Sequence, residues 1–294
     1  TSVCTNNLNI MVSTCEQLGF AINPDKLVAA TTTLEFLGIV LDTHKQEMRI
    51  SEQRLQEVMA ELLQWHQRAT ATKRDMLSLV GKLIFVSRVV KAGRTFVRRM
   101  LDQAKQIPHL HYKVALSEDF KKDVEWWLLF LPTWNGQSMF LQESWSSNLD
   151  LHLFTDASNV AASGYFRGEW FVIPFIGPLL ALASNSINWR EMYAIVVSAA
   201  TFGSQWSGQR IMMHCDNQSI VDVVRSGTCK NPLIMDLVRR LYFISATYAF
   251  EFSCCYVDTV SNDVADSLSR LQFDRFFGLV PQANRWMTEP VTLM

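Results

Sequence analysis

The sequence lacks the features of a membrane-spanning, secreted or zinc-binding protein. Its longest apolar run, residues 170–183, is broken by two prolines and a glycine and is too short to cross a bilayer. No signal peptide is visible at the amino terminus. The six cysteines form no Cys-x-x-Cys pair and no Cys/His spacing of the kind that zinc sites need, so free thiols in a reducing compartment are expected. We therefore expect a soluble intracellular protein of the cytoplasm or the nucleus, with no membrane partner.

The chain also lacks internal repeats, low-complexity tracts and an overall excess of charge. Its 294 residues suffice for two domains or one large one, and 49% hydrophobic and 19% charged residues are typical of globular proteins. The net charge of −1 is unevenly distributed, because residues 44–113 carry 14 basic and 6 acidic side chains, a net charge of +8. Such a block suits contact with a polyanion such as nucleic acid, although a solvated helix face explains the charge equally well.

Periodicity in the first half of the chain predicts mainly helices. Residues 9–19 have a helical pattern ending at Gly19, a C-cap candidate, and residues 20–22 and 34–41 read as short strands. Ser51 offers an N-cap for a helix to about residue 66. A second long helix is expected from about Thr72, with apolar residues on one side and basic residues on the other. A helix over 117–131 and a linker over 133–149 follow, with a domain boundary near 147.

The second half of the chain alternates between the strand and helix periods. Strands are expected at 151–155, 161–167, 169–175, 210–215 and 248–257, and helices at 189–203, 218–225 and 232–245. A last helix is expected to begin at Ser261 or Asn262, and residues 274–294 are expected to form a loose tail. This order indicates an α/β (α+β) fold with a mixed sheet.

Four acidic residues come from four different elements of this predicted fold. Asp156 and Asp216 each end a strand, Glu191 lies in the first turn of a helix, and Asp266 lies about one turn into the last helix. A lone aspartate at a strand end usually starts a turn, and each residue taken alone has that interpretation. If the two strands are neighbours in the sheet, however, Asp156 and Asp216 meet at one edge, the usual place for chemistry in open sheets.

Carboxylates gathered in this way predict a divalent-cation site. They repel one another at short range unless protons or cations are present, and Mg²⁺ prefers all-oxygen ligands. Two such ions about 4 Å apart can activate a water and stabilise the leaving oxygen of a phosphodiester. The pattern is therefore typical of nucleases and polymerases.

The segments around these acids resemble a known family. LFTDAS, NWREMYAI, MHCDNQSIV and NDVADSLSRL are similar, in order and spacing, to the four acidic motifs of the ribonuclease H domain of retroelement reverse transcriptases. The resemblance implies a ribonuclease H-like five-stranded mixed sheet. It also implies that Asp156, Glu191, Asp216 and Asp266 are the catalytic ligands of two Mg²⁺ ions, with Mn²⁺ as a substitute, and that Asp156 bridges both. By the same resemblance Asn188 and Gln218 contact the minor groove of an RNA/DNA hybrid.

The upstream half resembles other parts of the same polyprotein. CEQLGFAINPDKL and LEFLGIVLDT are similar to the end of a polymerase palm, with a primer-grip hairpin at Phe36, Leu37 and Gly38. MRISEQRLQEVMAELLQW and KRDMLSLVGKLIFVSRVVKAGRTFVRRML are similar to the thumb and connection of DIRS-like retrotransposons. The implied domains are residues 1–43 (palm end), 44–147 (basic thumb and connection), 148–272 (ribonuclease H-like) and 273–294 (tail). In this assignment a template–primer duplex contacts Lys91, Arg94, Arg98 and Arg99.

The sequence departs from the family at two points. It contains no Asp-Asp pair, so it cannot polymerise DNA by the chemistry of the Tyr-x-Asp-Asp motif, which belongs upstream. Tyr256 or Val257 stands where many relatives have a loop histidine, and loss of a proton shuttle slows cleavage by about 10²–10⁴-fold. Three hypotheses follow: a hybrid-specific ribonuclease, a non-catalytic nucleic-acid-binding module, and a piece of a longer polymerase that works beside other parts of its polyprotein.

Overall fold

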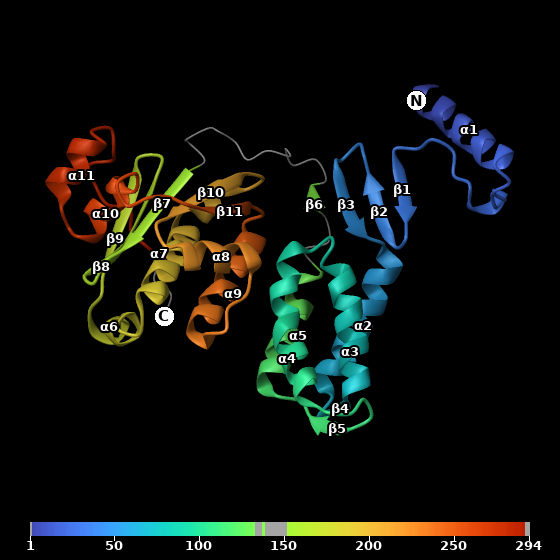
Figure 1. Ribbon diagram of the computed structural model, residues 1–294, viewed down its shortest axis with the longest axis horizontal. Helices are drawn as coiled ribbons and strands as arrows, with labels where there is room; N and C mark the ends of the chain where they lie inside the picture. Colours follow the sequence, from blue (N-terminus) through green and yellow to red (C-terminus); the bar gives the residue numbers. More distant parts are fainter. Residues whose placement is uncertain (1, 133–136, 139–151, 292–294) are drawn as a thin grey trace. The chain divides into compact units, whose positions relative to one another are not determined.

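The computed structural model describes residues 2–132, 137–138 and 152–291, except the side chains of residues 91, 137 and 138. The chain forms two compact units (Figure 1). Unit 1 comprises Thr1–Val90 and Ile107–Leu141, and unit 2 comprises Lys91–Gln106 and Gln142–Met294. The expected linker over 133–149 and the boundary near 147 lie outside the described residues, apart from positions 137 and 138. Among the described helices, none combines the length and the apolar character needed to cross a membrane.

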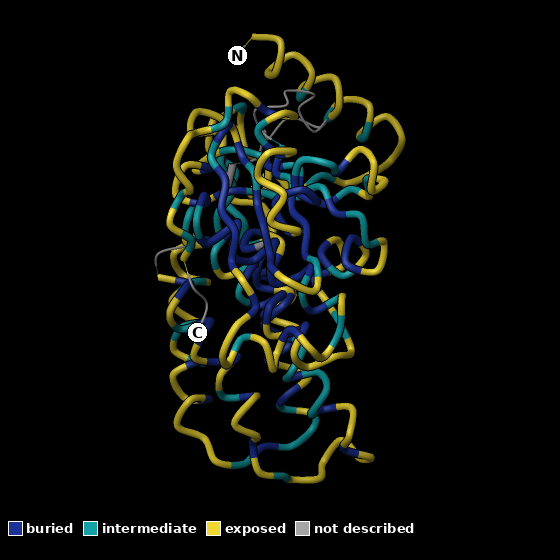
Figure 2. Tube along the Cα trace, turned by 90° about the vertical axis from the view of Figure 1, so that its left-hand side faces the viewer, coloured by how far each residue is buried: buried dark blue, intermediate teal, exposed yellow. Residues whose placement is uncertain are grey.

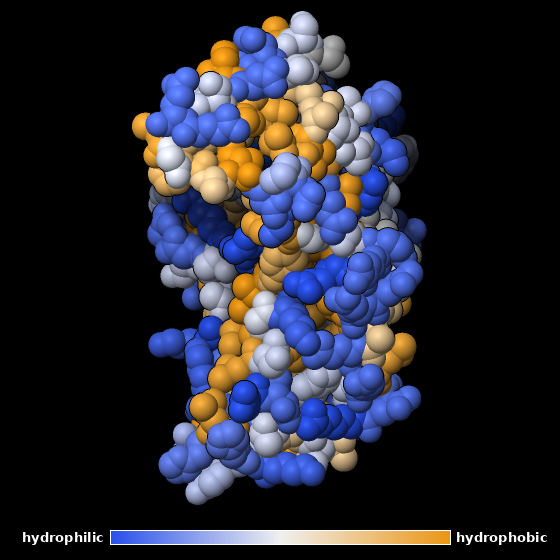
Figure 3. Space-filling view, turned by 90° about the vertical axis from the view of Figure 1, so that its right-hand side faces the viewer, coloured by the Kyte–Doolittle hydropathy of each residue, from blue (hydrophilic) through white to orange (hydrophobic). Residues whose placement is uncertain are grey.

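Unit 1 contains helices and two small antiparallel sheets, with strand orders β1-β2-β3-β6 and β4-β5. Helix α1 has no buried residue, and Figure 2 shows it exposed along its length near the amino terminus. Apolar side chains also remain exposed among polar ones in Figure 3, and Phe20 and Leu37 are 65% and 73% exposed. The elements are α1 (Ser2–Gln17), η1 (Pro24–Lys26), β1 (Thr33–Phe36), β2 (Ile39–Asp42), β3 (Glu47–Ile50), α2 (Glu52–Gln67), β4 (Thr70–Thr72), α3 (Lys73–Val86), β5 (Lys113–Ala115), α5 (Glu118–Phe130) and β6 (Gln137–Ser138).

Local chemistry explains several boundaries in unit 1. The expected Phe-Leu-Gly hairpin is present, because Leu37 and Gly38 both have positive φ (53° and 80°) and form the two-residue turn between β1 and β2. Helix α3 begins with a capping box in which Thr72 accepts from the Asp75 N–H and the Asp75 carboxylate accepts from the Thr72 N–H. Helix α2 follows Ser51 and packs against α5, where Trp65 stacks on Phe120 at 5.5 Å.

Two sequence expectations for the first hundred residues are wrong. Residues 20–22 form no strand, since this stretch has no neighbouring strand to pair with. The second long helix ends at Val86 instead of continuing into the basic segment. The Ser87 hydroxyl bonds the Leu83 carbonyl, and the N–H of Arg88 turns back to the carbonyl of Phe85, which tightens the last turn. The basic residues therefore lie on separate elements, η2 and α4, in unit 2.

Unit 2 is built around a five-stranded mixed sheet, as the predicted fold class requires. The strand order is β11-β10-β7-β8-β9, with β10 parallel to both β7 and β11, and β8 antiparallel to β7 and β9. Central β7 therefore has β10 as its parallel neighbour. The elements are η2 (Lys91–Val97), α4 (Arg98–Gln106), β7 (His152–Ala157), β8 (Ala161–Phe166), β9 (Glu169–Pro174), α6 (Gly177–Ala183), α7 (Ile187–Phe202), η4 (Gly203–Trp206), β10 (Arg210–Cys215), α8 (Gln218–Ser226), α9 (Pro232–Thr247), β11 (Glu251–Tyr256), α10 (Asp263–Ser269) and α11 (Phe273–Leu279).

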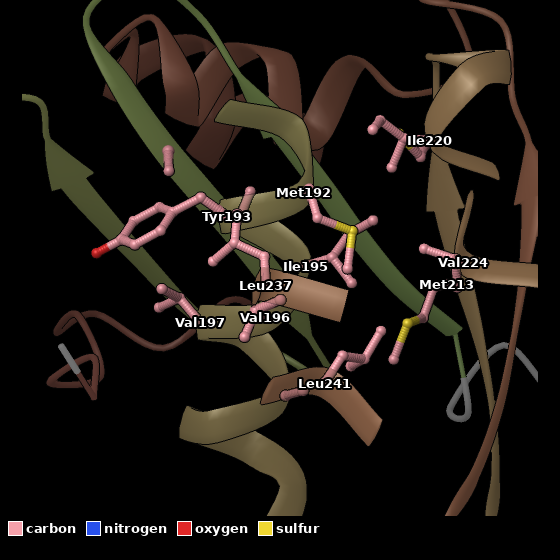
Figure 4. Packing of buried hydrophobic residues seen from close by; sticks show 14 of the residues in the cluster. Met192, Tyr193, Ile195, Val196, Val197, Met213, Ile220, Val224, Leu237 and Leu241 are labelled. Atoms are coloured by element: carbon pink, nitrogen blue, oxygen red, sulfur yellow. The ribbon is translucent and has the colours of Figure 1, made fainter. Parts of the chain in front are cut away.

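Helices α7 and α10 cover opposite faces of this sheet. The Ser163 hydroxyl on β8 donates to the Ala265 carbonyl in α10, whereas a Cβ at the next residue, Gly164, would meet Ser198 of α7. Successive residues of a strand point to opposite faces, so the two helices lie on different sides. Figure 4 shows the α7 side, where the side chains of α7 interlock with those of β10, α8 and α9. The labelled residues are Met192, Tyr193, Ile195, Val196, Val197, Met213, Ile220, Val224, Leu237 and Leu241.

Residues 274–294 were expected to be a loose tail, but the described part of this segment is packed against the sheet. Phe276 of α11 is fully buried and contacts Trp170 of β9, with ring centroids 5.3 Å apart. Beyond the helix, the Thr288 N–H donates to the Trp170 carbonyl, and the Trp170 indole donates to the Asn284 carbonyl. Strand β9 lies at the sheet edge, so its unpaired backbone groups give the segment hydrogen-bond partners. Helix α6, which the sequence did not predict, joins β9 to α7.

Candidate active site

The four acids predicted from the sequence line one pocket. Asp156 is in β7 and Asp216 directly follows the neighbouring parallel strand β10, so both reach the same edge of the sheet. Glu191 enters from α7 on one face and Asp266 from α10 on the other. The pocket has a volume of about 600 Å³, and Asp156, Glu191, Asp216 and Asp266 all contribute to its wall. The sheet order thus brings together four acids, of which each is 25 to 50 positions from the next in sequence.

Asp156 is a buried carboxylate with one strong partner. It is 6% exposed, and the Ser269 hydroxyl donates to its Oδ2. Burial raises the pKa of Asp156 from 3.8 to about 6; the Ser269 hydrogen bond lowers it, whereas the charges of Asp216 and Asp266 add to the rise. The folded chain therefore holds this negative charge at an energetic cost that a cation would offset.

Glu191 is still more deeply buried, at 2% exposure. Burial raises the pKa of Glu191 well above its usual value, and repulsion from Asp156 and Asp216 raises it further. The Ala157 N–H and the Cys215 thiol bond the carboxylate, and the Cys215 Sγ lies 3.8 Å from Oε2. Two buried carboxylates that repel each other in one pocket are the arrangement expected of a cation site.

The two remaining acids have polar partners at the pocket rim. Thr259 donates its hydroxyl to Asp216 Oδ2 at 3.2 Å. Asp266 is 7% exposed and pairs with Arg270, whose Nε lies 2.6 Å from Oδ1, and with Arg275, whose Nη1 lies 3.5 Å from Oδ2. Asp263, one turn before Asp266, pairs with Arg275 and does not line the pocket. Of these two acids on α10, Asp266 is therefore the one that lines the pocket.

Of the two residues assigned to the minor groove by resemblance, one lines the pocket. Gln218 is exposed at the start of α8, where its amide donates to Asp222 at 2.9 Å. Asn188, in the first turn of α7, accepts from the Asn217 amide at 2.7 Å, and Asn217 itself lines the pocket. Gln218 thus lines the acidic pocket, whereas Asn188 is linked to it through Asn217.

The predicted basic residues belong to η2 and α4, and those whose side chains the structure describes do not line the acidic pocket. Arg94 is exposed on η2, and Arg98 forms an ion pair with Asp102 at 3.1 Å, which neutralises part of its charge. Arg99 is half-buried, and the side chain of Lys91 lies outside the described residues. Segment η2 packs against α9 of the same unit. The basic segment therefore belongs to the unit that carries the acidic pocket.

Several residues that line the pocket or contact its acids were missed by sequence reasoning. Ser269 and Arg270 stand three and four positions after Asp266, a helical spacing that places them beside it and that could have identified them. Cys215 directly precedes Asp216, but nothing in the sequence shows that its thiol reaches Glu191. Tyr256, considered above for the position of the family's loop histidine, also lines the pocket.

The donor set of the pocket fits hard divalent cations. Four carboxylates supply oxygen ligands, the type that Mg²⁺ and Mn²⁺ use. Burial, together with repulsion from neighbouring carboxylates, raises the pKa of both Asp156 and Glu191, so their negative charges are unfavourable without a counter-ion. The same carboxylates thus provide the ligands for a divalent cation and the negative charge that attracts it.

No family model matches the chain, and no curated protein matches it. Among solved structures, RNase H1 from the halophilic archaeon Halobacterium salinarum NRC-1 is similar, with 17% identity and a TM-score of 0.32, over 42% of this chain and 96% of that one. The foamy viral protease-reverse transcriptase in complex with RNA/DNA hybrid is similar with 13% identity and a TM-score of 0.33, over 86% of this chain and 33% of that one. The same viral protein, as a dRH form in complex with double-stranded DNA, is similar with 12% identity and a TM-score of 0.32, over 79% of this chain and 39% of that one. This chain therefore spans well under half of these viral chains.

Proposed function

We propose that this chain is an endonuclease of the ribonuclease H type, which hydrolyses the RNA strand of RNA/DNA hybrids with the help of two Mg²⁺ ions. The observation that supports this proposal is the convergence of Asp156, Glu191, Asp216 and Asp266 on one pocket. Bound there, divalent cations would supply Lewis-acid stabilisation for phosphodiester hydrolysis, leaving 3′-hydroxyl and 5′-phosphate ends.

The chain's own residues have distinct roles in this proposal. Asp156 is buried in the pocket, interacts through its charge with Glu191, Asp216 and Asp266, and would be a ligand of the divalent cations. Ser269 and Thr259 orient Asp156 and Asp216 through their hydroxyl groups. Gln218, exposed at the pocket mouth, is the residue assigned to a minor-groove contact with the hybrid, where 2′-hydroxyls distinguish RNA from DNA.

A cleavage assay tests the proposal directly. The protein is incubated with Mg²⁺ and an RNA/DNA hybrid labelled on the RNA strand, beside single-stranded RNA and duplex DNA of the same sequence. We expect fragments from the hybrid alone, and a loss of at least about 10²-fold in Asp156→Asn, which keeps the shape of the side chain but removes a charged ligand. Asp274→Asn, an exposed acid of α11 outside the pocket, is the matched control and should cleave normally.

A non-catalytic nucleic-acid-binding module is the second candidate. Its specific support is the pairing of Asp266 with both Arg270 and Arg275, which already compensates this acid in the free protein. If wild type and Asp156→Asn shift the hybrid equally on a gel and leave the RNA equally intact, this second function replaces the first.

We also propose that the chain is part of a DIRS-like retrotransposon reverse transcriptase that acts in the cytoplasm or the nucleus beside other parts of its polyprotein. The motifs over residues 8–272 support this assignment. Polymerase activity would require the Tyr-x-Asp-Asp aspartates, which this sequence does not contain. A primer-extension assay should therefore give no product from this chain alone. Extension would contradict the inference that this chain lacks the residues needed for polymerase activity.

A further inference from the structure

A buried thiol contacts one of the acids of the pocket. Cys215, the last residue of β10, is fully buried, and its Sγ lies 3.8 Å from Glu191 Oε2. One ligand atom each from Glu191, Cys215 and Asp216 lie within 4.8 Å of one another. The ligands gathered here are therefore two oxygens and a sulfur, a mixed set that hard cations such as Mg²⁺ do not prefer.

The spacing of these atoms is close to that of a tetrahedral thiolate–carboxylate site. With a metal–sulfur distance of about 2.3 Å and a metal–oxygen distance of about 2.1 Å, tetrahedral geometry separates sulfur from oxygen by about 3.6 Å. The observed distance between Cys215 Sγ and Glu191 Oε2 is 3.8 Å, so a small side-chain rotation would bring the two atoms to the tetrahedral separation. Asp216 is less buried and lines the pocket, so it can adjust to complete the site.

We propose that Glu191, Cys215 and Asp216 form a binding site for a thiophilic divalent cation, of which Zn²⁺ and Cd²⁺ are the representatives. On binding, the Cys215 S–H bond breaks, its proton passes to the buffer, and a metal–sulfur bond forms without any electron transfer. Because Glu191 and Asp216 are also assigned to Mg²⁺, the two classes of cation compete for the same carboxylates. A thiophilic ion bound here blocks the site.

A second group of metal-ligating side chains, made of one cysteine and two histidines, lies on another part of the sheet and serves as a control for Cys215. Cys255 of β11 lies 3.2 Å from His214 Nδ1, and His214 Nε2 lies 2.9 Å from His152 Nδ1. The His214 ring stands between the two partners, so one ion cannot contact all three without rearrangement. This cluster contains no pocket acid, and a Cys255→Ala variant therefore separates its contribution from that of Cys215.

Titration with Cd²⁺, followed by the ultraviolet thiolate-to-metal charge-transfer absorbance, tests the proposal without any nuclease activity. We expect a saturable band in the wild type, its loss in Cys215→Ala, and its retention in Cys255→Ala. In Glu191→Gln the thiol remains but the affinity for Cd²⁺ should fall by at least about 10-fold. No band in the wild type, an unchanged band in Cys215→Ala, or an unchanged affinity in Glu191→Gln would each overturn the site.

The wild-type band does not depend on how the variants fold, and circular dichroism checks each variant. A second arm rests on the proposed function: Zn²⁺ added to a Mg²⁺-supported cleavage assay should inhibit the wild type at a concentration at least about 10-fold lower than Cys215→Ala. Equal inhibition of the two would also overturn the proposal. If the wild type cleaves no hybrid at all, the proposed function fails, and the spectroscopic arm still decides the metal site.

Discussion

Replacing Asp156 with asparagine should stabilise the metal-free protein. Asp156 is 6% exposed, and its pKa is raised to about 6 from 3.8, chiefly by burial. The folded state therefore binds this proton more tightly than the unfolded state does. The stability that the protonated Asp156 contributes is fully present below pH 3.8, is lost as the pH rises from about 4 to about 6, and stays lost above that range.

The structure sets the magnitude of this effect. At about 1.4 kcal/mol for each pKa unit, the carboxylate destabilises the metal-free fold by about 3 kcal/mol at neutral pH. Asparagine carries no charge, and its amide oxygen can still accept the Ser269 hydrogen bond. Because the Ser269 hydrogen bond to an amide oxygen is weaker than that to a carboxylate, we expect Asp156→Asn to raise the free energy of unfolding by about 2 kcal/mol at pH 7.5 in EDTA. For a unit of this size the gain raises Tm by about 4–8 °C.

Differential scanning calorimetry of wild type and Asp156→Asn, in EDTA at pH 4 and pH 7.5, measures the effect. The gain should be large at pH 7.5 and small at pH 4, where the wild-type carboxyl is protonated in the folded state and partly protonated in the unfolded state. Asp274→Asn, an exposed acid outside the pocket, should change stability by less than about 0.5 kcal/mol at either pH. Added Mg²⁺ should raise the Tm of the wild type more than that of Asp156→Asn. A gain of equal size at both pH values, or a loss at pH 7.5, would refute the electrostatic reasoning.

Three further outcomes follow from the same contacts. Gly164→Ala should destabilise unit 2 by about 1–3 kcal/mol, because its new methyl group would overlap the Ser198 hydroxyl of α7 and the Phe171 ring of β9. Gly278→Ala, with open space around it, should not, and equal Tm values for the two variants would contradict the tight packing of α7 on the sheet. Thr72→Ala removes the capping box of α3 and should lower the stability of unit 1 by about 1 kcal/mol in urea unfolding. An unchanged stability would show that the cap does not stabilise the helix. Hybrid binding should weaken steeply with salt, and Arg94→Ala should reduce the slope of log K against log[salt] by about 1, while an unchanged slope would remove this residue from the interface.

Local patterns in the sequence determined most elements of unit 2. Strand β10 begins and ends where the alternation over 210–215 predicted, because period-two burial is a property of neighbouring residues. Helix α7 was anticipated to within two residues from its apolar spacing. The two-residue turn at Leu37 and Gly38 was expected only from the family resemblance, because the local pattern read residues 34–41 as strand. The identities of the four acids were likewise available, since each stands at the end or start of such an element.

The tertiary structure decided what these elements do together. Pairing of β7 with β10 brings Asp156 beside Asp216, and packing of α7 and α10 on opposite faces delivers Glu191 and Asp266 to the same pocket. Helix α3 ends at Val86 although the apolar spacing continues, and the segment after α11 packs on β9 although it has little periodicity. The proximity of Cys215 to Glu191 has no signal in the sequence at all. Contacts between residues tens of positions apart depend on strand order and on which face each helix covers, and no local pattern encodes either of these.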